Sequence, residues 1–139
     1  MRTVLDTNIL FAGLYSAQGA SFQVLQAVKS KVVEPVLSVA LLFEYEDVLK
    51  RNSEKLGITY EDIELLLDNI CDLGSFYKIH YLWRPLLPDP KDDHVLELAV
   101  ASQVKHITTF NAKDFKGSEQ FDVNIITPKQ LLEKIKWEH

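Results

Sequence analysis

Short apolar runs rich in β-branched residues alternate along the chain with longer segments whose apolar residues recur at helical spacing. The runs expected to form strands are 3–5, 32–37, 76–81, 106–109 and 123–126. Strands that alternate with helices join through right-handed crossovers, which build a mainly parallel sheet covered by helices. The sequence therefore predicts a three-layer α/β/α sandwich around a central, mainly parallel sheet.

Residues that start helices lie between these runs. Ser38 is expected to cap a helix over 38–49, and Thr59, with Asp62 three residues later, a helix over 59–73. Further helices are expected to begin after Asp6 and to cover 22–29, 89–102 and 127–135. Pro35, inside the second strand, indicates an edge or irregular strand because proline lacks the N–H that a ladder needs.

The length of 139 residues fits one ordinary domain, and we expect a single domain over 1–139. Hydrophobic residues make up 47% and charged residues 25%, which excludes a mainly disordered chain. No apolar run approaches the roughly 18–20 residues that span a bilayer. The N-terminus does not resemble a signal peptide, so we expect a cytoplasmic protein without a membrane segment. Cys71 is the only cysteine, which excludes intrachain disulfides.

The charge balance limits the kind of nucleic acid contact that the chain can make. It carries 15 Lys and Arg against 20 Asp and Glu, a formal net charge of −5. Proteins that grip long DNA through its phosphates are usually basic, so a DNA-coating protein is excluded. A bound metal cation can still reverse the sign of the field at one site.

Acidic and amide side chains occur where several of the expected strands end. Asp6 follows the first strand, and Glu44 lies six residues into the helix after the second. Asp92 lies in the first turn of the expected 89–102 helix, and Asn111 and Asp114 follow the strand that ends at Thr109. Helix caps, turn formers and solvated helix acids explain each position separately. In parallel sheets, however, sites form beyond the carboxyl ends of the strands, so these side chains are expected to converge.

Such a cluster predicts a particular chemistry. Carboxylates held close together repel, and a hard divalent cation removes that repulsion. Oxygen ligands favour Mg²⁺ or Mn²⁺ over zinc or copper. One or two such ions polarise a phosphodiester and activate water, so the expected reaction is metal-assisted phosphodiester hydrolysis.

Four segments resemble the motifs of the PIN domain family, which includes VapC-type toxins of bacterial toxin–antitoxin pairs. They occur in family order at residues 4–8 (VLDTN), 38–49 (SVALLFEYEDVL), 89–99 (DPKDDHVLELA) and 109–115 (TFNAKDF). In the third motif an acid precedes a small helix residue by seven positions, which selects Asp92 rather than Asp93. The resemblance covers nearly the whole chain.

The resemblance implies a PIN fold and endonucleolytic cleavage of RNA with Mg²⁺ or Mn²⁺. Carried over by position, the metal ligands and catalytic acids would be Asp6, Glu44 and Asp92, and the groups that orient them would be Thr7, Asn8, Ser38 and Thr109. Many members carry an aspartate where this chain has Asn111, and Asp114 is a candidate to replace that acid. The family also implies a homodimer and, for a toxin, an antitoxin protein as partner.

Two alternatives from other classes stay open at this point. The first is a catalytically weak PIN-like module that binds RNA or a protein partner, which Asn111 and the acidic net charge favour. The second is a phosphatase with Asp6 as nucleophile. Haloacid-dehalogenase enzymes need a second aspartate two residues later, where this chain has Asn8, so this hypothesis is the weaker one.

Basic and aromatic residues outside the motifs are candidates for binding. Phosphate contacts are possible at Lys50, Arg51, Lys55, Lys113 and Lys116, although solvated lysines are common on helix ends. Phe11, Leu14 and Tyr15 follow the first motif and are candidates for a dimer seam or an antitoxin groove, with core packing as the alternative.

Overall fold

The computed structural model of the chain describes residues 1–79 and 92–138. The expected helix start at Asp89 and Pro90, and the last two residues of the expected strand 76–81, lie outside these residues.

Five parallel strands form the sheet of the described residues. They are β1 (Arg2–Leu5), β2 (Glu34–Leu37), β3 (Ser75–Phe76), β4 (His106–Thr108) and β5 (Asn124–Ile126). The spatial order is β3-β2-β1-β4-β5, and each neighbouring pair is parallel. The strand order therefore reverses between β1 and β4. In open parallel sheets, binding crevices form beyond the carboxyl ends of the strands at this point.

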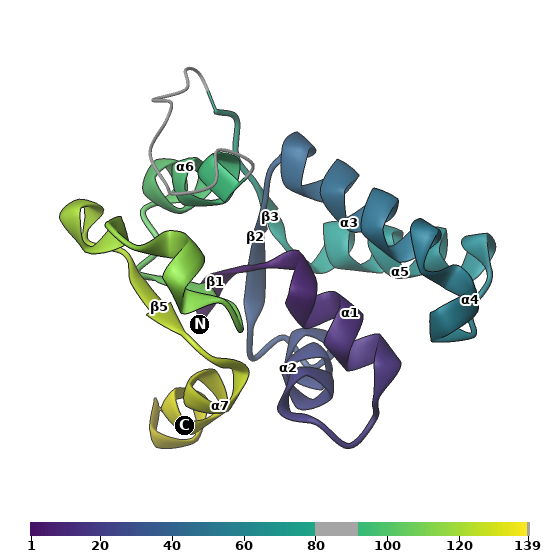
Figure 1. Ribbon diagram of the computed structural model, residues 1–139. Coiled ribbons are helices and arrows are strands. Elements are labelled where there is room, and N and C mark those ends of the chain that lie inside the picture. Colours follow the sequence, from purple (N-terminus) through teal and green to yellow (C-terminus); the bar gives the residue numbers. More distant parts are fainter. Residues whose placement is uncertain (80–91, 139) are drawn as a thin grey trace.

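Helices cover both faces of the sheet, as the sequence predicts. The helices are α1 (Thr7–Tyr15), α2 (Ala20–Lys29), α3 (Val39–Arg51), α4 (Ser53–Leu56), α5 (Tyr60–Leu73), α6 (Asp93–Ser102) and α7 (Pro128–Glu138). Two 3₁₀ turns, η2 (Ala112–Phe115) and η3 (Ser118–Phe121), separate β4 from β5. In Figure 1, α6 lies on one side of the sheet, and α1, α2, α3 and α5 lie on the other. The α/β/α architecture is confirmed.

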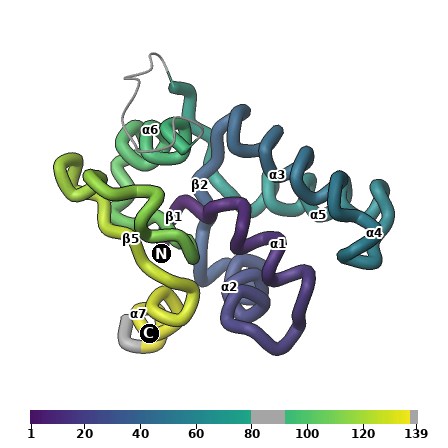
Figure 2. Tube along the Cα trace, in the orientation of Figure 1, coloured from purple at the N-terminus to yellow at the C-terminus, as the bar shows by residue number. Residues whose placement is uncertain are grey.

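The core lies between the sheet and these helices. Val4, Leu37 and Ile107 on the strands are fully buried, and Leu41, Tyr45 and Leu49 form the buried stripe of α3. The tube in Figure 2 shows the N-terminal strand in the middle of the molecule, beside segments from much later in the sequence. Arg2 pairs with Glu34 in β2, and Val4 pairs with Ile107 in β4. The first strand thus holds both halves of the sheet together.

The expected helix caps are present. Ser38 Oγ accepts a hydrogen bond from the Leu41 N–H at 3.1 Å and starts α3. Thr59 and Asp62 form a reciprocal capping box at α5, with distances of 3.1 and 3.2 Å. Thr127 and Gln130 make a similar pair before α7, which runs beyond the expected end to Glu138.

Two strand expectations are wrong in detail. The strand with Pro35 is not at an edge, because β2 lies between β1 and β3. The Glu34 N–H donates to Met1 O, on the side of β1. Successive N–H groups of a strand point to opposite sides, so the N–H that Pro35 lacks would point toward β3. The pairing with β3 begins one residue later, at Val36 and Ser75. Proline is tolerated there because no neighbouring strand needs its hydrogen bond. The third strand is also shorter than expected, with only Ser75 and Phe76.

Candidate active site at the carboxyl ends of β1 and β4

Asp6 lies where β1 ends and α1 begins, and its carboxylate is almost completely buried. The register that pairs Leu5 with Thr108 places Asp6 beside Thr109, the next residue on each strand. Oδ1 accepts the Thr7 N–H at 2.9 Å, so Asp6 caps α1. Oδ2 accepts the Thr109 hydroxyl at 2.7 Å and the Asn8 amide at 3.4 Å. The carboxylate is therefore held in one orientation at the switch point of the sheet.

The Thr109 hydroxyl joins three segments of the chain. While it donates to Asp6, it accepts the Asn8 side-chain amide at 3.2 Å and the backbone N–H of Asn111 at 3.1 Å. One buried oxygen thereby connects the end of β1, the start of α1 and the loop after β4. Thr109 and Asn8 thus both contact Asp6, and their role in orienting it for a metal ion stays a prediction.

Glu44 approaches the same place from α3. The Thr7 hydroxyl donates to Glu44 Oε2, and His94 Nε2 lies 3.1 Å from Glu44 Oε1. Thr7 therefore contacts two acids at once, Asp6 through its backbone N–H and Glu44 through its hydroxyl. His94 lies in the first turn of α6, so its contact brings the start of α6 to the same position.

Tyr45 fixes α3 relative to the end of β1. Its side chain is fully buried, and its hydroxyl donates to the carbonyl oxygen of Leu5. Burial raises the pKa of Tyr45 well above its ordinary value, and the charges of Asp6 and Glu44 raise it further. The phenol therefore stays protonated and keeps Glu44, the residue before it, opposite Asp6.

The two acids differ in their electrostatic environment. Burial is the main cause that raises the pKa of Asp6 above its ordinary value. Hydrogen bonds from Thr109 and Thr7 oppose the rise, and the charges of Glu44 and Asp114 add a smaller contribution to it. Burial also acts to raise the pKa of Glu44, but hydrogen bonds from His94 and Thr7, together with the electrostatic interaction with His94, bring it below its ordinary value. Glu44 is a stable anion, whereas the Asp6 anion is strained chiefly by burial and further by its negative neighbours.

The structure distinguishes Asp114 from Asn111. Asp114 is half-buried in η2, close enough for its charge to raise the pKa of Asp6. Asn111 is exposed before η2, and the hydrogen bonds described for it come from its backbone. Of these two residues, Asp114 is therefore the one that adds negative charge at Asp6.

The remaining predicted residues lie at helix ends. Asp92 is half-buried at the N-cap position of α6, two residues before His94, whereas Asp93 is fully buried in the first turn. Ser38 caps α3, and among the described residues its side chain has no hydrogen bond to an acid. Ser38 thus fixes the start of the helix that carries Glu44.

Two side chains at this position were not among the predicted site residues. Tyr45 was expected only in the core, although a buried phenol needs a hydrogen-bond partner and follows Glu44 directly. No other histidine lies at metal-ligand spacing from His94. The only feature of the sequence that pointed to His94 as a site residue was its place two residues after Asp92. Its contact with Glu44 depends on the packing of α6 against α3, which no local pattern encodes.

The donor atoms fit a hydrated hard cation. Within residues 1–79 and 92–138, no group of three or more His, Cys, Asp or Glu side chains is arranged to hold a metal ion. Mg²⁺, however, usually keeps several waters and binds through one or two carboxylates. The strained Asp6 anion is such a carboxylate, and Asn8 Oδ1 is a buried oxygen that accepts no hydrogen bond from the described residues. Both features suit an ion that brings its own waters.

The fold and this position define a parallel α/β protein with acids at the switch point of its sheet. A family model described as PIN domain matches residues 2–113, which is most of the chain. The chain belongs to the PIN domain family. PIN domains are generally nucleases that use divalent metals. No curated protein and no solved structure matches the chain. In the described part of the chain, no helix has the length and apolar character to cross a membrane.

Proposed function

We propose that this protein is an endoribonuclease that hydrolyses RNA phosphodiester bonds with Mg²⁺ or Mn²⁺. The observation that carries the proposal is the double contact of Thr7, which holds Asp6 and Glu44 together at the switch point of the sheet. Acids fixed in this way at a sheet edge are suited to bind a cation beside a phosphate.

The residues that would hold the cation are Asp6, Glu44, Asp92 and Asp114. A bound divalent cation would supply Lewis-acid activation of the phosphodiester and of the attacking water. The strained anion of Asp6 is the group that gains most from a positive charge, because Glu44 and Asp114 both act on it. Asn111 stays a weaker candidate because its amide carries no charge and its side chain is exposed.

The other residues of the site act by holding these acids in place. Thr109 fixes one oxygen of Asp6 and Thr7 fixes the other, so little reorganisation is needed when a charge arrives. His94 and Thr7 together hold both oxygens of Glu44. Groups that orient metal ligands in this way typically change metal affinity or activity about 10- to 100-fold when removed.

We further propose that the protein is a VapC-like toxin of a toxin–antitoxin pair in the cytoplasm. A homodimer and an antitoxin protein are the partners that this proposal implies. The four motifs in family order support it, because VapC-type toxins belong to the family that these motifs resemble. A neighbouring reading frame that encodes a small DNA-binding protein would support the pair directly.

A second candidate function is a catalytically weak module that binds RNA or a protein. The observation that favours it is that the described acids do not form a group of three around one point. Calorimetry with Mn²⁺ separates the two functions. A catalytic site gives a heat of Mn²⁺ binding that disappears in Glu44→Gln and persists in Glu133→Gln, an exposed glutamate on α7.

The test of the main proposal is cleavage of RNA by the purified protein. We expect cleavage of single-stranded RNA with Mn²⁺ or Mg²⁺ and none after the metal is chelated. Substrates of varied sequence and secondary structure guard against a narrow target. Intact RNA with every substrate, together with no heat of Mn²⁺ binding, would overturn the proposal in favour of the binding module.

Asp114 and Asn111 give a prediction about the fourth acid. Asp114→Asn removes a charge that acts on Asp6, so we expect RNA cleavage to fall about 10- to 100-fold at limiting Mn²⁺. Asn111→Ala keeps its backbone N–H bond to Thr109, so we expect cleavage within about threefold of wild type. Rates measured across a Mn²⁺ titration check both variants. A larger loss in Asn111→Ala than in Asp114→Asn would contradict the assignment.

A further inference from the structure

Two aromatic rings form a shared surface on α1. The rings of Phe11 and Tyr15, one helical turn apart, have centroids 5.8 Å apart and planes inclined by only 12°. Tyr15 is 58% exposed, and Phe11 is half-buried beside it. An exposed tyrosine ring held parallel to its neighbour offers a flat apolar face at little further cost in side-chain entropy.

A lysine from a separate helix lies over both rings. Lys55, on α4, has its Nζ 5.6 Å from the centroid of Phe11 and 5.7 Å from that of Tyr15. Lys50 and Arg51, which the sequence also suggested as phosphate contacts, are neutralised by Glu46, Glu64 and Asp47. Among the described residues, Lys55 has no carboxylate partner. Its charge therefore remains available to an anionic ligand.

This aromatic and basic surface includes side chains of the helix that begins directly after Asp6. Asn8, Phe11 and Tyr15 follow one another at helical spacing along a partly exposed face of α1. Asn8 contacts Asp6, and at 1.5 Å per residue Tyr15 lies about 10 Å further along the helix axis. A polymer bound at Asp6 can therefore extend along α1 to the two rings.

We propose that Phe11, Tyr15 and Lys55 form a subsite for a single-stranded segment of RNA next to the cleaved bond. A base stacks on the exposed ring of Tyr15, which Phe11 holds in place, and the Lys55 ammonium moves from the rings to the adjacent phosphate. Stacking of a base outweighs an exposed cation–π contact, so this exchange is favourable. In a chain with a net charge of −5, such a local contact is needed to hold RNA. The inference rests on the proposed ribonuclease function.

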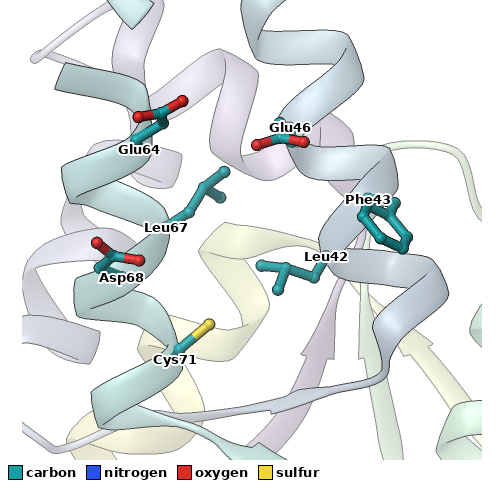
Figure 3. Close-up of a pocket in the computed structure, with 7 residues that line it drawn as sticks. All are labelled: Leu42, Phe43, Glu46, Glu64, Leu67, Asp68 and Cys71. Atoms are coloured by element: carbon teal, nitrogen blue, oxygen red, sulfur yellow. The ribbon is translucent and has the colours of Figure 1, made fainter. Parts of the chain in front are cut away.

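A similar pair elsewhere in the molecule provides matched controls. Lys50 Nζ lies 5.3 Å from the ring centroid of Tyr60, which is 53% exposed. Figure 3 shows Glu46 and Glu64 reaching from α3 and α5 toward the gap between these helices, and Lys50 binds them at 3.3 and 2.9 Å. The Tyr60 and Lys50 pair thus has the same chemistry without a free charge, and we expect it to contribute nothing to RNA binding.

Binding of a labelled RNA oligonucleotide, followed by fluorescence anisotropy, tests the subsite. In an Asp6→Asn background, which keeps the RNA intact, we expect Tyr15→Leu to weaken binding of a single strand about 5- to 150-fold. Binding of a duplex of the same sequence should not change, because its bases are already stacked. A plot of the logarithm of the binding constant against the logarithm of the salt concentration has a negative slope. Lys55→Gln should make this slope less steep by about 0.7, the value for one phosphate on a single strand. Tyr60→Leu and Lys50→Gln should bind like the parent.

Cleavage by the otherwise wild-type chain provides the second readout. Because the subsite lies away from the reacting phosphate, Tyr15→Leu should raise KM and leave kcat nearly unchanged. The anisotropy measurement does not depend on catalysis. If the protein binds RNA but does not cleave it, the ribonuclease proposal fails and the proposed subsite is unaffected. Unchanged single-strand binding in both Tyr15→Leu and Lys55→Gln would overturn the subsite. Unchanged binding with a dimer converted to a monomer would identify the surface as a subunit contact instead.

Discussion

Asp6→Asn is expected to lower RNA cleavage by about three orders of magnitude. The substitution removes the buried negative charge that a cation would neutralise, and metal stabilisation of a transition state is worth several kcal/mol, with tenfold in rate for each 1.36 kcal/mol. The amide keeps an oxygen that can accept the Thr7 N–H, so the cap of α1 survives. Cleavage rates at saturating Mn²⁺ measure the effect.

The same variant is expected to lose little stability in the absence of metal, because two effects oppose each other. Because the pKa of folded Asp6 is raised, the folded chain holds this proton more tightly than the unfolded chain. The contribution of Asp6 to stability therefore falls as pH rises above its ordinary pKa of 3.8, and the charged group is unfavourable at neutral pH. Asparagine avoids this cost, but its amide nitrogen cannot accept the hydrogen bonds that Oδ2 accepts from Thr109 and Asn8. Thermal unfolding at pH 7, with a chelator, measures the difference.

Mn²⁺ should raise the Tm of wild type by mass action and leave that of Asp6→Asn unchanged. Asp68→Asn is the matched control, since Asp68 is exposed on α5 and should retain both cleavage and the shift in Tm. Equal cleavage by wild type and Asp6→Asn would remove Asp6 from the catalytic site. A marked loss of Tm in the metal-free variant would instead assign Asp6 a mainly structural role.

Thr109→Val is expected to affect both stability and activity. Valine keeps the shape but lacks the hydroxyl that serves Asp6, Asn8 and the Asn111 N–H. Thr109 is 1% exposed, so its former partners are left with buried polar atoms that lack a hydrogen bond. We expect the free energy of unfolding to fall by about 1–3 kcal/mol, measured by urea denaturation. We also expect cleavage to fall about 10- to 100-fold, because Asp6 loses the group that orients Oδ2.

Thr109→Ser distinguishes the contribution of the hydroxyl from that of the methyl group, because serine keeps only the hydroxyl. Serine restores the oxygen, so most of the lost activity should return even where the missing methyl group lowers stability. A role in packing alone predicts the opposite order, with valine better tolerated than serine. Rates and urea midpoints of the two variants, measured side by side, decide between these roles.

Local patterns were sufficient for most of the elements. The capping residues Ser38 and Thr59 start α3 and α5 as predicted, because a cap needs only its own side chain and the next turn. The strands β1, β4 and β5 are marked by β-branched residues, which are buried in β1 and β4 and partly buried in β5. Of the two alternatives that Pro35 suggested for β2, an edge or an irregular strand, the edge position is wrong, since the cost of a missing N–H depends on whether a neighbouring strand needs a hydrogen bond at that residue.

The sequence by itself determined which acids are available and at which strand and helix ends they stand. Only the tertiary structure decided how they are held, as in the contacts of Thr109 with Asp6, of His94 with Glu44, and of Tyr45 with Leu5. Each of these bonds joins residues at least 40 positions apart. Their formation follows from strand register and helix packing, which depend on burial across the whole core and not on any local pattern.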